Sequence, residues 1–157
     1  MNDDLFGNIE YDLFWIGKYS WPIFGKRIVT PLYIICDEDD EIEPAQRAAF
    51  TAFDLQKDVF CARAEGAIYA HYVEILPEYR ERFGAEFADR WAPEVDTLSD
   101  VGRLVTPEAV LIQQSFAEPR ERVVGLLFKC TWESSLGLAV KFVNEQLIEV
   151  GPQDIVL

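Results

Sequence analysis

Residues 124–132 read Val-Gly-Leu-Leu-Phe-Lys-Cys-Thr-Trp, and every second side chain in this stretch, starting at Val124, is apolar. A period of two is typical of a β-strand that lays one face on a hydrophobic core. Asn144-Glu145 supplies turn chemistry further along the chain, so the sequence predicts a meander of antiparallel strands here. The same period recurs on both sides, at Val110 and Ile112, at Leu138, Val140 and Phe142, and at residues 147–150.

The N-terminal third carries a second set of strand patterns. Alternation over residues 9–15 predicts a strand, which Gly17 and then Ser20-Trp21-Pro22 are expected to interrupt. A second strand is predicted over residues 27–36, where Pro31 indicates a bulge or an edge position. We expect these two strands to pair as a hairpin.

The middle third predicts helices. Residues 37–43 hold six acids in seven positions and Pro44 follows, which indicates a helix start because carboxylates there complement the positive end of the helix dipole. Apolar residues then recur at helical spacing over residues 45–53 and again over about 56–76, and Pro77 is expected to end the second helix. Their shared apolar face comprises Ala49, Phe53, Phe60, Ala64, Ala67, Ile68 and Ile75.

Residues 78–104 fit either a short amphipathic helix or a covering loop, and Pro93 and Gly102 are typical of irregular chain. The whole pattern predicts the α+β class. We expect an antiparallel sheet of about six strands, built from the N-terminal hairpin and the C-terminal meander, with the helices packed on one face. A length of 157 residues suits one domain, spanning residues 1–157, that buries roughly 70% of the surface of its unfolded chain.

The chain is strongly acidic, with 28 Asp and Glu against 14 Lys and Arg and a formal net charge of -14. Nucleic acid and an anionic membrane surface are not expected as partners, because both are bound through clustered Lys and Arg. Two interpretations of the acidity stay open. It keeps the protein soluble, or its field attracts a basic macromolecule.

The sequence predicts a cytoplasmic protein. Residues 1–4 lack the basic region of a secretory signal, and no apolar run approaches the roughly 20 residues that cross a bilayer. Three cysteines form no close pair and do not indicate a disulfide scaffold. Cys36 and Cys130 lie in apolar strand patterns and are interpreted as small buried hydrophobic residues.

A search for catalytic residues returns one weak pair. His71, the only histidine, precedes Glu74 by three residues on the predicted helix, but two ligands do not make a metal site, and a partly buried structural ring is the simpler interpretation. Ser134 and Ser135 lack the glycine spacing of a nucleophile elbow, and the nine glycines form no phosphate-binding loop. We expect binding and not catalysis, with no cofactor and no metal ion.

The acidic run is the candidate binding site. Its alternating acids resemble a calcium loop but lack the glycine and the glutamate that such a loop needs at its sixth and twelfth positions. Clustered carboxylates repel each other, and a cationic partner would relieve that repulsion. The run is therefore either a solvated helix start or a partner-binding patch made of Asp37, Glu38, Asp39, Asp40, Glu41 and Glu43.

Three segments resemble a group of small bacterial domains of unknown function: Leu126–Trp132, Gly137–Val140 and Glu149–Gly151. That group typically carries Trp-Asp-Pro-Glu-His-Gly at the turn after the first segment and ends on Val-Gly. The N-terminal half is similar too, with a β-hairpin, an acidic helix start and a helix that ends near Tyr72, so the likeness extends over about 140 residues. In this chain the turn reads Trp132-Glu133-Ser134-Ser135-Leu136-Gly137, where only the first and last residues match.

Members of this group resemble immunity proteins of bacterial toxin systems, including contact-dependent growth inhibition, in which a cytosolic protein neutralises one cognate toxin domain. The resemblance implies that this chain is such an antitoxin and that its partner is a toxin domain. A nuclease-like toxin must be basic to hold its substrate, and an acidic inhibitor fits that cleft. The alternative is a general acidic binding or scaffold domain with endogenous partners.

Overall fold

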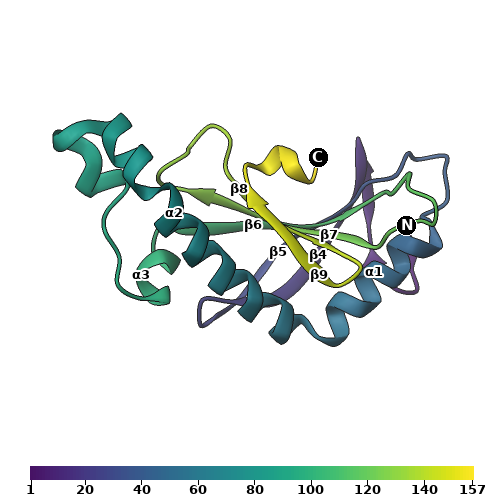
Figure 1. Ribbon diagram of the computed structural model, residues 1–157. Coiled ribbons are helices and arrows are strands. Elements are labelled where there is room, and N and C mark those ends of the chain that lie inside the picture. Colours follow the sequence, from purple (N-terminus) through teal and green to yellow (C-terminus); the bar gives the residue numbers. More distant parts are fainter.

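The computed structural model describes residues 1–157 and is an α+β fold (Figure 1). A seven-stranded sheet has the order β3-β4-β5-β6-β7-β8-β9, and a separate two-stranded ribbon pairs β1 with β2. The prediction of about six strands is therefore one short for the main sheet. The elements are β1 Asn2–Asp3, β2 Gly7–Asn8, β3 Glu10–Asp12, β4 Phe14–Ile23, β5 Lys26–Ile34, α1 Pro44–Leu55, α2 Lys57–Trp91, α3 Leu98–Gly102, β6 Val105–Gln113, β7 Val123–Cys130, β8 Leu138–Val143, β9 Gln146–Gly151 and the 3-10 turn η1 Gln153–Ile155.

The N-terminal hairpin forms, but its first strand lies further along the chain than the sequence predicts, whereas β5 lies close to the predicted residues 27–36. Strand β4 runs through Ser20-Trp21-Pro22 without interruption and pairs with β5 from Trp15 to Ile23. The buried indole of Trp21 holds this stretch, because its Nε1 donates a hydrogen bond of 2.9 Å to Thr30 Oγ1 across the hairpin. Pro31 lies where β5 has no partner on its β6 side, since the ladder with β6 begins at Leu32.

One pairing in the sheet is parallel, where the sequence predicts only antiparallel strands. Leu32–Ile34 of β5 pairs with Val110–Ile112 of β6, and every other pairing is antiparallel. Helices α1 and α2 carry the chain from the end of β5 back to the start of β6, and such a return is what a parallel pair requires. This junction joins the N-terminal hairpin to the C-terminal meander.

Helix α2 continues past Pro77, which was expected to end it. The carbonyl that Pro77 leaves without a partner belongs to Val73, an exposed residue four positions earlier, where water can satisfy it. The helical path breaks at Gly84, whose φ of 75° is in the left-handed region. Residues 78–91 thus form a helical hairpin, with Gly84 at its bend, that extends beyond the sheet at the left of Figure 1.

The two faces of the sheet are covered differently. Helices α1 and α2 pack on one face over a core of 30 buried residues, as the sequence predicts. On the opposite face the C-terminal segment covers a smaller cluster, in which the side chain of Val156 lies against Gly125 (Figure 1). All three cysteines are buried and free, and the predicted burial of Cys36 and Cys130 is confirmed. No helix has the length and the apolar character that a membrane crossing needs.

Candidate functional site

The acidic loop, Asp37–Glu43, connects β5 to α1, and hydrogen bonds hold its two ends together. Gln46 joins both ends of the loop, because its Nε2 donates to Ile35 O at 2.8 Å and its Oε1 accepts from Glu43 N at 3.0 Å. Ile42 is buried within the loop and anchors it to the core. The loop therefore presents its side chains from a fixed backbone.

A buried thiol lies under the acidic loop. Cys36 Sγ is 3.5 Å from the carbonyl oxygens of Asp37 and Glu41 and 3.7 Å from that of Asp40, so its single proton has three acceptors in reach. Burial, followed by the nearby acids, raises the pKa of the Cys36 thiol. The thiol stays protonated and remains a hydrogen-bond donor to the loop.

The first five carboxylates of the acidic loop point into solvent. Their side chains make no hydrogen bond and no ion pair with any other group of the chain. Clustered carboxylates that form no ion pairs repel each other, and a bound cation would reduce that repulsion. The five residues are Asp37, Glu38, Asp39, Asp40 and Glu41.

Glu43, the sixth predicted residue, has a different role. Its side chain is only 23% exposed; Oε1 accepts a hydrogen bond of 3.1 Å from Gln114 Nε2, and Oε2 lies 3.9 Å from Arg120 Nε. These contacts join the start of α1 to the connection between β6 and β7. The structure therefore separates Glu43, which is engaged inside the chain, from the five free acids.

The positively charged side chain beside the acidic loop is Arg47, and it already forms an ion pair with Asp3. A depression of about 340 Å³ is lined by Glu38, Asp40 and Glu41 on one side and by Asp3 and Arg47 on the other. Arg47 donates two hydrogen bonds to Asp3, at 3.0 and 2.8 Å, and Asp3 Oδ1 also accepts from two backbone N–H groups. The Arg47 guanidinium holds the pKa of Asp3 well below its usual range. Arg47 is thus engaged mainly with Asp3, although Glu41 still acts on its charge, and Met1 lines the same depression while its ammonium group donates to Ile9 O.

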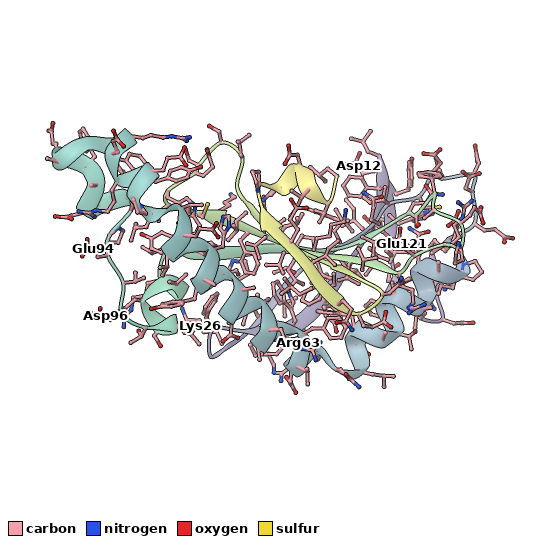
Figure 2. All side chains as sticks on the ribbon, in the orientation of Figure 1. Asp12, Lys26, Arg63, Glu94, Asp96 and Glu121 are labelled. Carbon is pink, nitrogen blue, oxygen red and sulfur yellow. The ribbon has the colours of Figure 1, made fainter.

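The helical hairpin is charged at a lower density than the loop, and it pairs two of its acids with its own arginines. Arg80 Nη2 contacts Asp89 Oδ1 at 2.8 Å, and Arg80 Nη1 donates to Ala92 O at 2.8 Å, which ties the two arms together. Arg82 forms an ion pair with Glu78 one helical turn away. Glu94 and Asp96 mark this end of the molecule in Figure 2, and Glu121 marks the opposite end, where the acidic loop lies.

The structure places the catalytic candidates on different elements. His71 is half-buried on α2, and desolvation lowers its pKa against the opposing effect of Glu74. Ser134 and Ser135 lie exposed in the turn between β7 and β8. No group of three or more His, Cys, Asp or Glu side chains is arranged to hold a metal ion.

Two features of this site were missed from the sequence. The Asp3–Arg47 pair joins residues far apart in the chain, and no local pattern indicates it. The role of Glu43 did have a signal, because an N-terminal acid followed three residues later by Gln46 is the spacing of a capping box.

The fold and the site define a small α+β domain with an exposed and unpaired acidic loop. The chain belongs to the DUF6985 family, described as a domain of unknown function, whose family model matches residues 5–157. No curated protein and no solved structure matches the chain. Family membership covers nearly the whole chain but brings no activity with it, because the family is described as being of unknown function.

Proposed function

We propose that the protein is a cytosolic immunity protein that binds and neutralises a cognate bacterial toxin domain of basic, nuclease-like character. The observation that supports this proposal is the set of five exposed carboxylates, Asp37–Glu41, none of which forms an ion pair within the chain. A helix start gains from one or two acids near its first turn, and five free ones exceed that need. A basic surface that docks on the loop supplies the missing charges.

The loop acts mainly on the rate of association. Unpaired surface charges of one sign steer an oppositely charged partner, and such steering raises association rates to about 10⁸ M⁻¹s⁻¹ at low salt. The net charge of -14 adds to the same field. The final affinity depends on buried contacts that form once the two surfaces have met.

The test is neutralisation of the toxin domain encoded beside the gene for this protein. Cells that produce that domain are expected to grow only when this chain is present, and the two proteins are expected to co-purify. Association should slow by an order of magnitude or more between about 50 and 200 mM salt, because the Debye length falls over this range. Absence of a neighbouring toxin, or binding that is indifferent to salt, contradicts the proposal.

A matched pair of variants assigns the effect to the loop. Charge reversal to Lys at Asp39, Asp40 and Glu41 is expected to slow association strongly and to leave the far-UV circular dichroism unchanged. The same reversal at Glu81, Glu86 and Glu94, which lie exposed near the other end, changes the net charge equally and should have a much smaller effect. Equal slowing by both variants would favour a general acidic binding domain with endogenous partners.

A further inference from the structure

A second binding site is suggested by a pocket of about 420 Å³ between the helical hairpin and the turn after β7. Four aromatic side chains line this aromatic pocket, and one carboxylate and one guanidinium complete its charged lining. It lies at the end of α2 away from the acidic loop, on the left of Figure 1, so one small contact cannot cover both sites. The lining is Tyr79, Phe83, Trp91 and Trp132 with Glu133 and Arg82.

Hydrogen bonds between its two walls fix the shape of the aromatic pocket. Tyr79 Oη donates to Glu133 Oε1 at 3.1 Å, and Thr131 Oγ1 donates to Trp91 O at 2.8 Å. Burial and the Glu133 hydrogen bond raise the pKa of Tyr79, so its hydroxyl stays a neutral donor. The second carboxylate oxygen of Glu133 makes no hydrogen bond in the chain and remains free to accept one.

This combination of groups suits a cation. The faces of aromatic rings attract ammonium and guanidinium groups, and Trp and Tyr do so more strongly than Phe. A carboxylate beside the rings adds charge and accepts hydrogen bonds from a planar guanidinium. Aromatic walls alone would suit any apolar side chain, and Glu133 makes the pocket selective for a positive one.

The chain itself already places a guanidinium over each of two of these rings, and one of them, that of Arg90, lies 4.6 Å from the centroid of the Trp91 ring. Arg82 lies over the Tyr79 ring at 4.8 Å from the ring centroid, and its side chain is 58% exposed and held otherwise only by Glu78. An exposed ion pair one helical turn apart contributes little to stability. The Arg82 side chain can therefore move away from the Tyr79 ring at little cost.

We propose that the aromatic pocket binds an arginine side chain of a partner protein, and that Arg82 occupies part of the site until that arginine displaces it. This site is separate from the acidic loop and does not rest on the proposed toxin. Because Arg82 competes with the incoming cation, its removal strengthens binding, although most losses of a contact residue weaken it.

The experiment uses two probe peptides that differ only in charge, acetyl-Gly-Arg-Gly-amide and the same peptide with neutral citrulline in place of arginine. Binding to the full chain is followed by NMR through the four indole N–H signals. The arginine peptide is expected to shift the signals of Trp91 and Trp132 at millimolar concentration and to leave those of Trp15 and Trp21 in place. The citrulline peptide should bind at least threefold more weakly.

Three variants complete the test. Glu133→Gln, which still accepts the Tyr79 hydrogen bond, should weaken arginine binding about three- to tenfold. Arg82→Gln should strengthen it about threefold, and Arg63→Gln, which removes the same charge from an exposed position elsewhere on α2 (Figure 2), should change it less. Arg82→Gln is exposed enough to fold normally even if Glu133→Gln does not. The proposal is overturned if the two peptides bind equally, or if Arg82→Gln binds no better than Arg63→Gln.

Discussion

The acidic loop and the helical hairpin are two charged regions at opposite ends of one long helical segment, and they use their charges in opposite ways. In the helical hairpin, Arg80 and Arg82 each contact a carboxylate of the same element. In the acidic loop, five successive carboxylates have no partner, and Arg47 beside them is held by Asp3. A count of charged residues therefore says little about which acidic region is free to bind.

Backbone geometry explains the difference. A helix brings residues four apart onto one face, and a hairpin brings its second arm beside the first, so acids and bases of one segment meet. The acidic loop has neither regularity, and it contains no base within its seven residues. Pairing of charges therefore depends on the backbone as much as on composition.

The largest effect is expected for Asp3→Asn, which frees Arg47 from its bidentate partner. Asp3 is only 8% exposed and accepts four hydrogen bonds, so the change should lower the free energy of unfolding by about 2 kcal/mol at neutral pH. The folded pKa of Asp3 is depressed, so its contribution is fully present above the unfolded pKa of about 3.9 and is lost as pH falls below that value. Urea unfolding at several pH values measures both expectations. A constant difference between the two proteins from pH 7 to pH 3 would contradict them.

Arg80→Gln should have the next largest effect, because it removes the link between the two arms of the helical hairpin. We expect a larger loss of stability than in Arg82→Gln, since the Arg80 side chain is only 27% exposed and the Ala92 carbonyl loses a charged donor. Arg82→Gln removes the same charge from an exposed position and should cost less than about 0.5 kcal/mol. Similar losses in the two variants would show that net charge matters here more than the hairpin contact.

Within the acidic loop, Glu43→Ala and Glu41→Ala should have different effects on the stability of the protein. Loss of Glu43 removes the contacts with Gln114 and Arg120, so we expect thermal unfolding to report a destabilisation of about 1 kcal/mol. Loss of Glu41, which has no partner, should leave stability within about 0.5 kcal/mol of the wild type. The reverse order would mean that the loop is held together through its exposed acids.

The smallest expected effect is a gain in stability. Changing all five residues 37–41 to their amides should raise the free energy of unfolding by about 0.5 kcal/mol at low salt, because the repulsion removed among five neighbouring acids exceeds the attraction lost toward the helix start and Arg47. The gain should disappear near 1 M salt, where the Debye length is about 3 Å. Changing Glu78 and Asp89 to amides serves as the control, and these paired acids should show no gain. A loss of stability in the five-residue variant would assign the loop a structural role.

Local patterns predicted much of the fold. The alternation in β7 and β8 and the helical spacing of α1 could be read directly, because each follows from which side chains face the core. Strand β4 was cut short in the prediction because glycine and proline usually end strands, whereas here Trp21 and its bond to Thr30 keep the strand regular. The parallel pairing of β5 with β6 depends on contacts between distant segments, which no local pattern encodes.

The candidate site was predicted only in part, because some of its contacts also join distant segments of the chain. The acidic run is visible as six acids in seven residues, but the sequence does not say which of them are free. That distinction comes from Asp3, Gln114 and Arg120, which reach the site from other parts of the chain. The aromatic pocket was not predicted, because its walls come from the end of α2 and from the turn after β7.

The parallel junction between β5 and β6 also bears on how the protein folds. The N-terminal hairpin and the C-terminal meander each consist of neighbouring strands, so each can form early through contacts that are local in sequence. The junction must wait until Leu32 meets Val110, which requires closing a loop that contains both long helices. We therefore expect formation of this single junction to limit the folding rate, so substitutions of its buried residues would slow folding more than equally destabilising changes in the helical hairpin.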